Sequence, residues 1–246
     1  MKVLILAAGY ATRLYPLTLN KAKPLLTIGG KPILEYIFDN IKNVDDLREV
    51  YIVTNSKFAK DFSSWASKYK FHKPVKVIDD GTTSDSDRLG AIGDMLFIIN
   101  QAKIDDDLMV IAGDNLFNFE LEPFVEFARK KNKACVGVHD LANKSLLSRY
   151  GVLSLDENGK VIEFQEKPAV PKSSLISMGL YYFPKGKLSL IGEYIKSGQK
   201  PDQPGNYISW LSKKEDVYGF VFKVDWYDIG DPVSLKEATQ KFEKGA

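Results

Sequence analysis

The sequence has one cysteine and two histidines among its 246 residues. The single cysteine, Cys135, excludes an internal disulfide, which fits a reducing compartment and leads us to expect a cytoplasmic protein. One cysteine and two histidines argue against a zinc site built from these residues. Its apolar runs fall far short of the roughly 18 residues of a membrane span, and the first is too short for a signal peptide. We therefore expect no membrane partner.

The chain also lacks an excess of charge of one sign. Its 34 Lys and Arg residues nearly balance 32 Asp and Glu residues, and they form no polybasic run. Proteins that bind nucleic acids carry clusters of basic residues, which this chain lacks, so we expect no nucleic-acid partner. A hydrophobic content of 44% and a charged content of 27% are ordinary for a globular protein that buries a substantial core.

Short apolar runs alternate with amphipathic stretches through the first 140 residues. An apolar run predicts a buried strand, and apolar residues at helical spacing predict a helix. This alternation favours an α/β sheet with parallel strands. The predicted strands are 3–6, 50–53, 75–78, 108–111 and 134–138, and the predicted helices are 32–41, 58–69, 89–101 and 121–131.

The pattern changes after about residue 140. Two apolar runs flank an Asn158-Gly159 turn, which predicts a β-hairpin. We expect antiparallel strands here to join the same sheet, and we see no linker or repeat, so we predict one domain, 1–246. The predicted strands are 151–155, 161–165, 176–183 and 217–224, and the predicted helices are 188–197 and 232–241.

The first apolar strand opens directly into a loop of small residues, Ala7-Ala8-Gly9-Tyr10-Ala11. Small residues let backbone N–H groups point at an anion with little obstruction. Arg13 and Lys23 add positive charge at the mouth of this loop, as a triphosphate requires. A lone Gly9 matches neither a dinucleotide-binding turn nor a P-loop. Taken alone, the loop could equally be a surface turn with two solvated cations.

Two further segments carry carboxylates, and the first of them is a candidate metal ligand. Asp114 lies just past the end of a predicted buried strand, where open α/β sheets bind ligands. Asp228 follows an aromatic pair, and Asp231 precedes Pro232 at a helix start, which is typical of an N-cap. One or two carboxylates plus phosphate oxygens suffice for Mg²⁺. The Asp105-Asp106-Asp107 run precedes a strand, so we interpret it as a solvated turn.

Taken in order along the chain, these segments resemble the sugar-phosphate nucleotidyltransferases, the nucleotide-sugar pyrophosphorylases. The resemblance implies an α/β fold, the three-layer α/β/α nucleotide-diphospho-sugar transferase fold, Rossmann-like with a mixed, mostly parallel central sheet. It also implies that residues 1–140 form a nucleotide-binding half and residues 141–246 a sugar-phosphate-binding half. The chain stops soon after the last motif, so we expect no further domain behind it.

The resemblance also implies roles for single residues. Arg13 and Lys23 are the implied catalytic cations, and Asp114 and Asp228 are the implied Mg²⁺ ligands. The implied nucleotide-binding residues are Leu6, Ala7, Ala8, Gly9, Tyr10, Ala11, Thr12, Arg13, Leu89 and Gly90, and the implied substrate-binding residues are Gly151, Glu166, Lys167, Gly179 and Tyr181.

Two departures from the family pattern stand out. Most members carry glycine where this chain has Ala11, and the alanine narrows the freedom of the loop backbone. The segment that would read the base keeps the Leu89-Gly90-Ala91 turn, but no glutamine precedes it and residues 80–87 are rich in Asp and Ser. The nucleobase therefore does not follow from the sequence.

The implied reaction joins a nucleoside triphosphate and a sugar 1-phosphate, with Mg²⁺, and releases pyrophosphate. Glucose 1-phosphate with dTTP or UTP is the pair that the resemblance favours. Three alternatives stay open: a cytidylyltransferase for phosphocholine or inositol phosphate, a glycosyltransferase, and an inactive regulatory subunit that binds nucleotide-sugar. The sugar and any homo-oligomer also stay open.

Overall fold

The computed structural model describes residues 1–224 and 226–243, and the chain divides into two compact units. The first, called here the loop unit, comprises Lys2–Arg88, Ile111–Glu122 and the described C-terminal residues from 226 onward. The second, called here the hairpin unit, comprises Met1, Leu89–Val110 and Pro123–Val224. Both units draw on residues from either side of position 140, and each is described by itself below.

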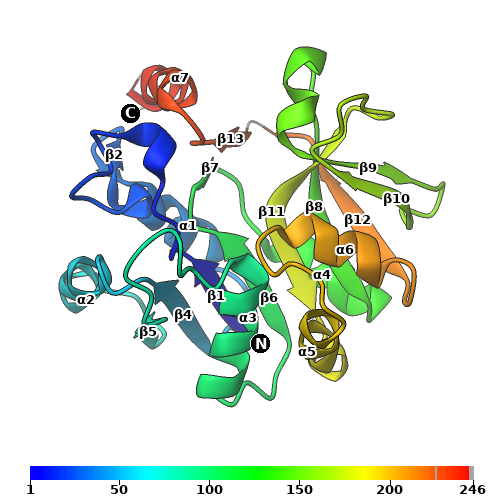
Figure 1. Cartoon of the computed structure of the whole chain (residues 1–246), viewed down its shortest axis with the longest axis horizontal. Coiled ribbons are helices and arrows are strands. Elements are labelled where there is room, and N and C mark those ends of the chain that lie inside the picture. Colours follow the sequence, from blue (N-terminus) through cyan, green and yellow to red (C-terminus); the bar gives the residue numbers. More distant parts are fainter. Residues whose placement is uncertain (225, 244–246) are drawn as a thin grey trace. The chain divides into compact units, whose positions relative to one another are not determined.

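Three parallel strands form the sheet of the loop unit (Figure 1). Leu4 of the first strand lies opposite Tyr51, and Ile52 lies opposite Val77. The first two strands are almost wholly buried, which explains their continuous apolar sequence. The strands are β1 (Lys2–Leu6), β4 (Glu49–Thr54) and β5 (Val75–Asp79), and the helices α1 (Ile33–Ile41) and α2 (Ala59–Lys68) belong to the same unit.

Two short strand pairs complete the loop unit. The antiparallel ribbon of β7 (Asn115–Phe117) and β13 (Trp226–Asp228) joins residues more than 100 positions apart in the sequence. Helix α7 (Pro232–Glu243) contacts β13 and β2 (Thr27–Ile28), and β2 pairs with β3 (Lys31–Pro32) (Figure 1). The late segments are thereby fixed to the early ones by a small core of Leu14, Ile28, Ile33, Tyr36, Leu116, Ile229 and Ala238.

Antiparallel pairing dominates the hairpin unit. Strand β11 pairs antiparallel with β8 and β9, β10 pairs antiparallel with β9, and β12 pairs parallel with β8. The predicted turn is confirmed: Gly159 has a φ of 79°, and the Asp156 carboxylate accepts from the Asn158 and Lys160 amides. The strands are β8 (Ala134–Asp140), β9 (Gly151–Leu155), β10 (Val161–Glu166), β11 (Leu175–Phe183) and β12 (Val217–Phe222).

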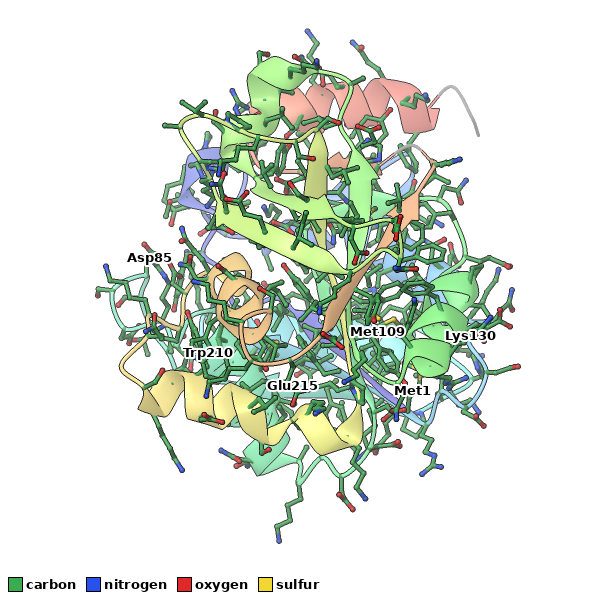
Figure 2. All side chains as sticks on the ribbon, turned by 90° about the vertical axis from the view of Figure 1, so that its right-hand side faces the viewer. Met1, Asp85, Met109, Lys130, Trp210 and Glu215 are labelled. Atoms are coloured by element: carbon green, nitrogen blue, oxygen red, sulfur yellow. The ribbon has the colours of Figure 1, made fainter. Side chains whose placement is uncertain are left out.

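An aromatic cluster packs two helices of the hairpin unit together. The ring of Tyr194 on α5 (Ser189–Lys196) lies 5.3 Å from that of Tyr207 and 5.5 Å from that of Trp210, both on α6 (Pro204–Leu211). Figure 2 labels Trp210 on α6 and Glu215 in the turn that follows. Helix α3 (Ala91–Gln101) belongs to this unit as well, while β6 (Leu108–Ala112) and α4 (Glu122–Lys131) carry the chain between units.

The predicted α/β class with a mixed sheet is confirmed. Every predicted helix and strand is present, with ends that agree to within two residues. The structure adds elements that the sequence analysis missed, above all β7, β13 and α6. In the described part of the chain, no helix has the length and apolar character needed to cross a bilayer.

Candidate functional site

Hydrogen bonds fix the backbone of the small-residue loop on one side, and the loop is open around Gly9 on the other. The Ala7 amide donates to the Val53 carbonyl at 2.9 Å, and the buried Asn55 side chain donates to the Ala8 carbonyl at 2.9 Å. Gly9 is exposed, and no atom lies within 4 Å of where its Cβ would be. An anion could therefore approach this backbone freely. Sequence analysis missed Asn55, although a polar residue directly after a buried strand was a usable signal.

Ala11 adopts a left-handed conformation in this loop, with φ 49° and ψ 42°. The buried Thr18 hydroxyl donates to the Ala11 carbonyl at 2.8 Å and fixes the turn. A non-glycine residue here carries backbone strain, and such strain gathers at functional loops. Ala11, where most family members carry glycine, is thus the residue of this loop whose left-handed backbone favours glycine. The exposed Arg13 follows in the 3₁₀ helix η1 (Thr12–Leu14).

Lys23 joins three segments of the loop unit. It begins the 3₁₀ helix η2 (Lys23–Leu25), and its Nζ lies 2.7 Å from Oδ2 of Asp114 and 2.8 Å from the carbonyl oxygen of Ile229. Its side chain is only 15% exposed. The predicted catalytic lysine and one predicted metal ligand are therefore in direct contact.

Close backbone approach places Asp114 beside the loop. The Gly113 amide donates to the Leu6 carbonyl at 2.8 Å, and a Cβ at Gly113 would lie only 2.7 Å from that oxygen. Any side chain at this position would push the strand end away from the loop. Gly113 therefore positions Asp114.

The β7/β13 ribbon brings in the second carboxylate. Asp228 pairs with Asn115, and the Trp226 Nε1 donates to the Asn115 Oδ1 at 3.0 Å. The Ile229 amide donates to the Asp114 carbonyl at 3.2 Å. Asp231 caps α7 by accepting from the Val233 and Ser234 amides, which confirms its predicted N-cap role and leaves Asp228 as the metal candidate.

The pKa values of the two carboxyl groups are shifted in opposite directions. Burial opposes the ionisation of Asp114, but the charge and hydrogen bond of Lys23 hold the pKa of its carboxyl below the usual value. Burial first, and then the nearby Asp114 carboxylate, raise the pKa of Asp228 to about 7 against the pull of Lys23 and Arg13. Lys23 contacts Asp114, while Asp228 feels the repulsion of the Asp114 carboxylate, so a divalent cation between them would relieve that repulsion. These residues fit Mg²⁺, although the described residues contain no group of three or more acidic, His or Cys ligands.

Three predicted residues, Gly151, Glu166 and Lys167, lie in the hairpin unit with Phe164 beside them, and these four residues are called here the Glu166 corner. The Lys167 Nζ lies 3.7 Å from Glu166 Oε1 and remains 48% exposed, while the Glu166 side chain is 13% exposed. Burial raises the pKa of Glu166, against the effect of Lys167. Lys167 itself has a φ of 47°, and its amide donates to the Tyr150 carbonyl at 3.0 Å.

Gly151 is packed against the same corner. A Cβ on it would lie 2.6 Å from Phe164 Cζ and 3.1 Å from Glu166 Oε2. The absence of a side chain at Gly151 therefore makes room for both of these neighbours. Its predicted approach to the sugar stays a prediction.

Other predicted residues lie outside these clusters. Leu89 and Gly90 precede α3, and Gly90 has a φ of 78°. Gly179 has a φ of 69° on β11, where Tyr181 is buried and its hydroxyl lies 3.2 Å from that of Ser177. Tyr10 is buried, and burial raises the pKa of its hydroxyl. Their substrate roles stay predictions.

The Asp105-Asp106-Asp107 run has structural partners. The Tyr182 hydroxyl and the Lys185 amide donate to the Asp107 carboxylate at 2.5 and 2.8 Å. The Lys185 Nζ pairs with Asp105 at 2.8 Å. Hydrogen bonds and an ion pair therefore hold this turn in place.

The geometry agrees with the comparison with known proteins. A family model described as nucleotidyl transferase matches residues 2–245. The chain belongs to the nucleotidyl transferase family. It is 32% identical to the bifunctional protein GlmU of Methanocaldococcus jannaschii over 98% of this chain and 54% of that protein. It is 31% identical to the UTP–glucose-1-phosphate uridylyltransferase of Synechocystis over 94% of this chain and 60% of that protein. The chain thus spans 54–60% of these curated relatives.

Solved structures of nucleotidyl transferases share the fold. A Bacillus anthracis protein, provisionally named a glucose-1-phosphate thymidylyltransferase and crystallised with sucrose, matches with a TM-score of 0.78 at 27% identity, over 99% of this chain and 95% of its own. A UDP-glucose pyrophosphorylase complexed with UDP-glucose matches with a TM-score of 0.83 at 20% identity, over 100% and 99%. The predicted membership of the sugar-phosphate nucleotidyltransferases is therefore confirmed.

Proposed function

We propose that this nucleotidyl transferase transfers a nucleoside monophosphate from a nucleoside triphosphate to a sugar 1-phosphate. The observation that carries this proposal is the contact of Lys23 with Asp114, next to Asp228 and to the open small-residue loop. A pure binding protein has no need for two carboxylates and a lysine in this arrangement. A glycosyltransferase would start from a ready-made nucleotide-sugar and would not need a triphosphate loop.

The loop unit would bind the triphosphate. Loop amides and Arg13 would hold the phosphate oxygens, and Lys23 would add charge from the other side. Asp114 and Asp228 would hold Mg²⁺, which when bound supplies charge neutralisation at phosphate oxygens. Lys23 contacts Asp114, which supports the proposal that it acts at the same phosphates.

The hairpin unit would bind the sugar phosphate. Lys167 would neutralise the incoming phosphate, and the Glu166 carboxylate would accept a hydrogen bond from a sugar hydroxyl. A phosphate oxygen of the sugar attacks the α-phosphorus in line, the bond from that phosphorus to the bridging oxygen breaks, and pyrophosphate leaves with the electron pair. Little covalent help is required, so positioning and electrostatics supply the catalysis.

Glucose 1-phosphate with dTTP or UTP is the substrate pair we propose. The Synechocystis relative is named for glucose 1-phosphate and UTP, and the Bacillus anthracis relative is named for glucose 1-phosphate and thymidylyl transfer. The buried lone Cys135 fits a reducing compartment, so we place the reaction in the cytoplasm.

The test is Mg²⁺-dependent release of pyrophosphate from the full chain. Each nucleoside triphosphate is crossed with a panel of sugar 1-phosphates, phosphocholine and inositol phosphate, and light scattering gives the oligomeric state of the same sample. Turnover with a sugar 1-phosphate supports the proposal, and the best pair identifies base and sugar. Turnover only with CTP and a non-sugar phosphate would overturn the sugar assignment. Silence across the panel, from folded protein that binds nucleotide, would favour a regulatory subunit.

A further inference from the structure

Gly205 faces the Glu166 corner from a different element. It is the second residue of α6, and it is buried. A Cβ built on Gly205 would overlap Oε2 of Glu166 and would lie 2.6 Å from Phe164 Cε1. Gly151 faces the same two side chains from β9. Two glycines from separate elements therefore enclose one carboxylate.

The position of α6 is fixed from both ends. Towards its C-terminus, Tyr207 and Trp210 pack on Tyr194, and Tyr207 is fully buried. Just before α6, the carbonyl oxygens of Pro201 and Asp202 accept from the Ile92 and Ala91 amides at 2.8 and 3.4 Å. A side chain at position 205 could not be accommodated by a shift of the helix.

The chain segment before α6 also packs closely against Gly90. A Cβ on Gly90 would lie 2.7 Å from the Asp202 Cα and 2.8 Å from the Pro201 carbonyl oxygen. Residues 201–205 therefore contact the predicted nucleotide-binding turn at one end and the predicted sugar-binding carboxylate at the other. Neither contact was visible in the sequence, where Pro204-Gly205 has the composition of a turn.

We propose that Gly205 is a positioning residue that holds the Glu166 carboxylate in its sugar-binding orientation by having no side chain. This inference rests on the proposed function, because it assigns the carboxylate to a sugar hydroxyl. The present position of Glu166 Oε2 is incompatible with a methyl group at position 205, and Phe164 Cε1 lies close to the same point. A methyl group at position 205 therefore turns the carboxylate out towards solvent and away from the bound sugar.

The experiment compares Gly205→Ala with Gly192→Ala. Gly192 lies on the neighbouring helix α5, and a Cβ there meets only Leu96 Cδ1 at an ordinary 3.6 Å. Alanine favours a helix over glycine, so without a clash both variants would be equally tolerated. We expect Gly205→Ala to raise the KM for the sugar phosphate about tenfold or more while the KM for the triphosphate stays within about twofold. Gly192→Ala should leave both constants unchanged.

A second pair of variants tests the contact without reference to activity. In urea unfolding, Gly205→Ala should lower the midpoint in the Glu166 background and lower it less when combined with Glu166→Ala, where only the close contact with Phe164 remains. An additive result would overturn the steric contact.

The kinetic outcomes are separable. An active wild type with an unchanged sugar-phosphate KM in Gly205→Ala would overturn the positioning role and leave the proposed function standing. A wild type that is inactive with every substrate would overturn the proposed function and, with it, this role for Gly205. Non-additive unfolding together with the selective rise in KM would establish the inference.

Discussion

Each unit holds one lysine–carboxylate pair among its predicted site residues. The two pairs differ in distance, in exposure and in the direction of the carboxyl pKa shift. Lys23 lies 2.7 Å from Asp114 and is largely buried, whereas Lys167 lies 3.7 Å from Glu166 and is half exposed. The pKa of Asp114 is lowered, mainly because Lys23 outweighs its burial, while that of Glu166 is raised because burial outweighs Lys167. The first lysine is buried in a direct contact with its carboxylate, whereas the second is half exposed at a longer distance from its own.

The largest expected effect comes from breaking the first pair. Asp114→Asn keeps the shape of the side chain but removes its charge, so Mg²⁺-dependent turnover should fall at least about a hundredfold. Circular dichroism should show an unchanged fold. Asp61→Asn, on helix α2, provides a matched control that should retain full activity. Near-wild-type turnover in Asp114→Asn would remove this residue from the metal site.

Breaking the second pair should affect binding more than turnover. Lys167→Met keeps the length of the side chain and loses its charge. A charge-assisted hydrogen bond contributes about 1.5–3 kcal/mol, so the KM for the sugar phosphate should rise about 10- to 100-fold. Initial rates at varied sugar phosphate measure this change, and Lys172→Met serves as the control because Lys172 pairs with Glu163 away from the corner. If kcat fell and the KM stayed constant, Lys167 would act in the chemical step.

The raised pKa of Glu166 predicts a pH dependence that Asp114 should not share. Folded protein takes up this proton at a higher pH than the unfolded chain does. The free energy of unfolding should therefore fall as the pH rises from about the ordinary glutamate value through the raised one. Glu166→Gln should lack this slope and be no less stable at neutral pH, with a difference of about 1 kcal/mol or less. Urea unfolding at several pH values measures both chains, and parallel curves would contradict the burial argument.

The smallest effect concerns Ala11, the left-handed residue in the loop of the first unit. Ala11→Gly removes roughly 1–2 kcal/mol of backbone strain but adds about 0.5–1 kcal/mol of unfolded-state entropy. The net gain should be about 0.5–1 kcal/mol in unfolding free energy. Gly9→Ala, where no atom lies within 4 Å of the new methyl, is the matched control for a change of one methyl group. A loss of stability in Ala11→Gly would show that the loop carries no strain at this residue.

The sequence predicted what depends on local pattern. Apolar runs such as Val50–Val53 and the periodicity of Ile33–Ile41 reflect burial on one or both faces, which is readable residue by residue. Strands β7 and β13 were missed because each has three residues and exists only through pairing with the other. Helix α6 was missed because Pro204-Gly205 at its start has the composition of a turn.

The candidate site divides in the same way. Arg13, Lys23, Asp114 and Asp228 were predicted from motif order, and the structure places Lys23 against Asp114 and brings Asp228 beside it through the β7/β13 ribbon. The supporting residues Asn55, Gly113 and Gly205 act through contacts with distant backbone or side chains. Apart from the polar residue that follows a buried strand at Asn55, these contacts have no signature in a single sequence, because they depend on which atoms the completed fold brings within reach.

The β7/β13 ribbon also sets an order of events during protein synthesis. A growing chain that has reached the end of α6 already carries the loop, Lys23 and Asp114, yet it lacks β13 and therefore Asp228. Until translation passes that point, Asn115 and Leu116 have no partner strand. The nascent chain consequently cannot bring the two carboxylates together until β13 has been translated.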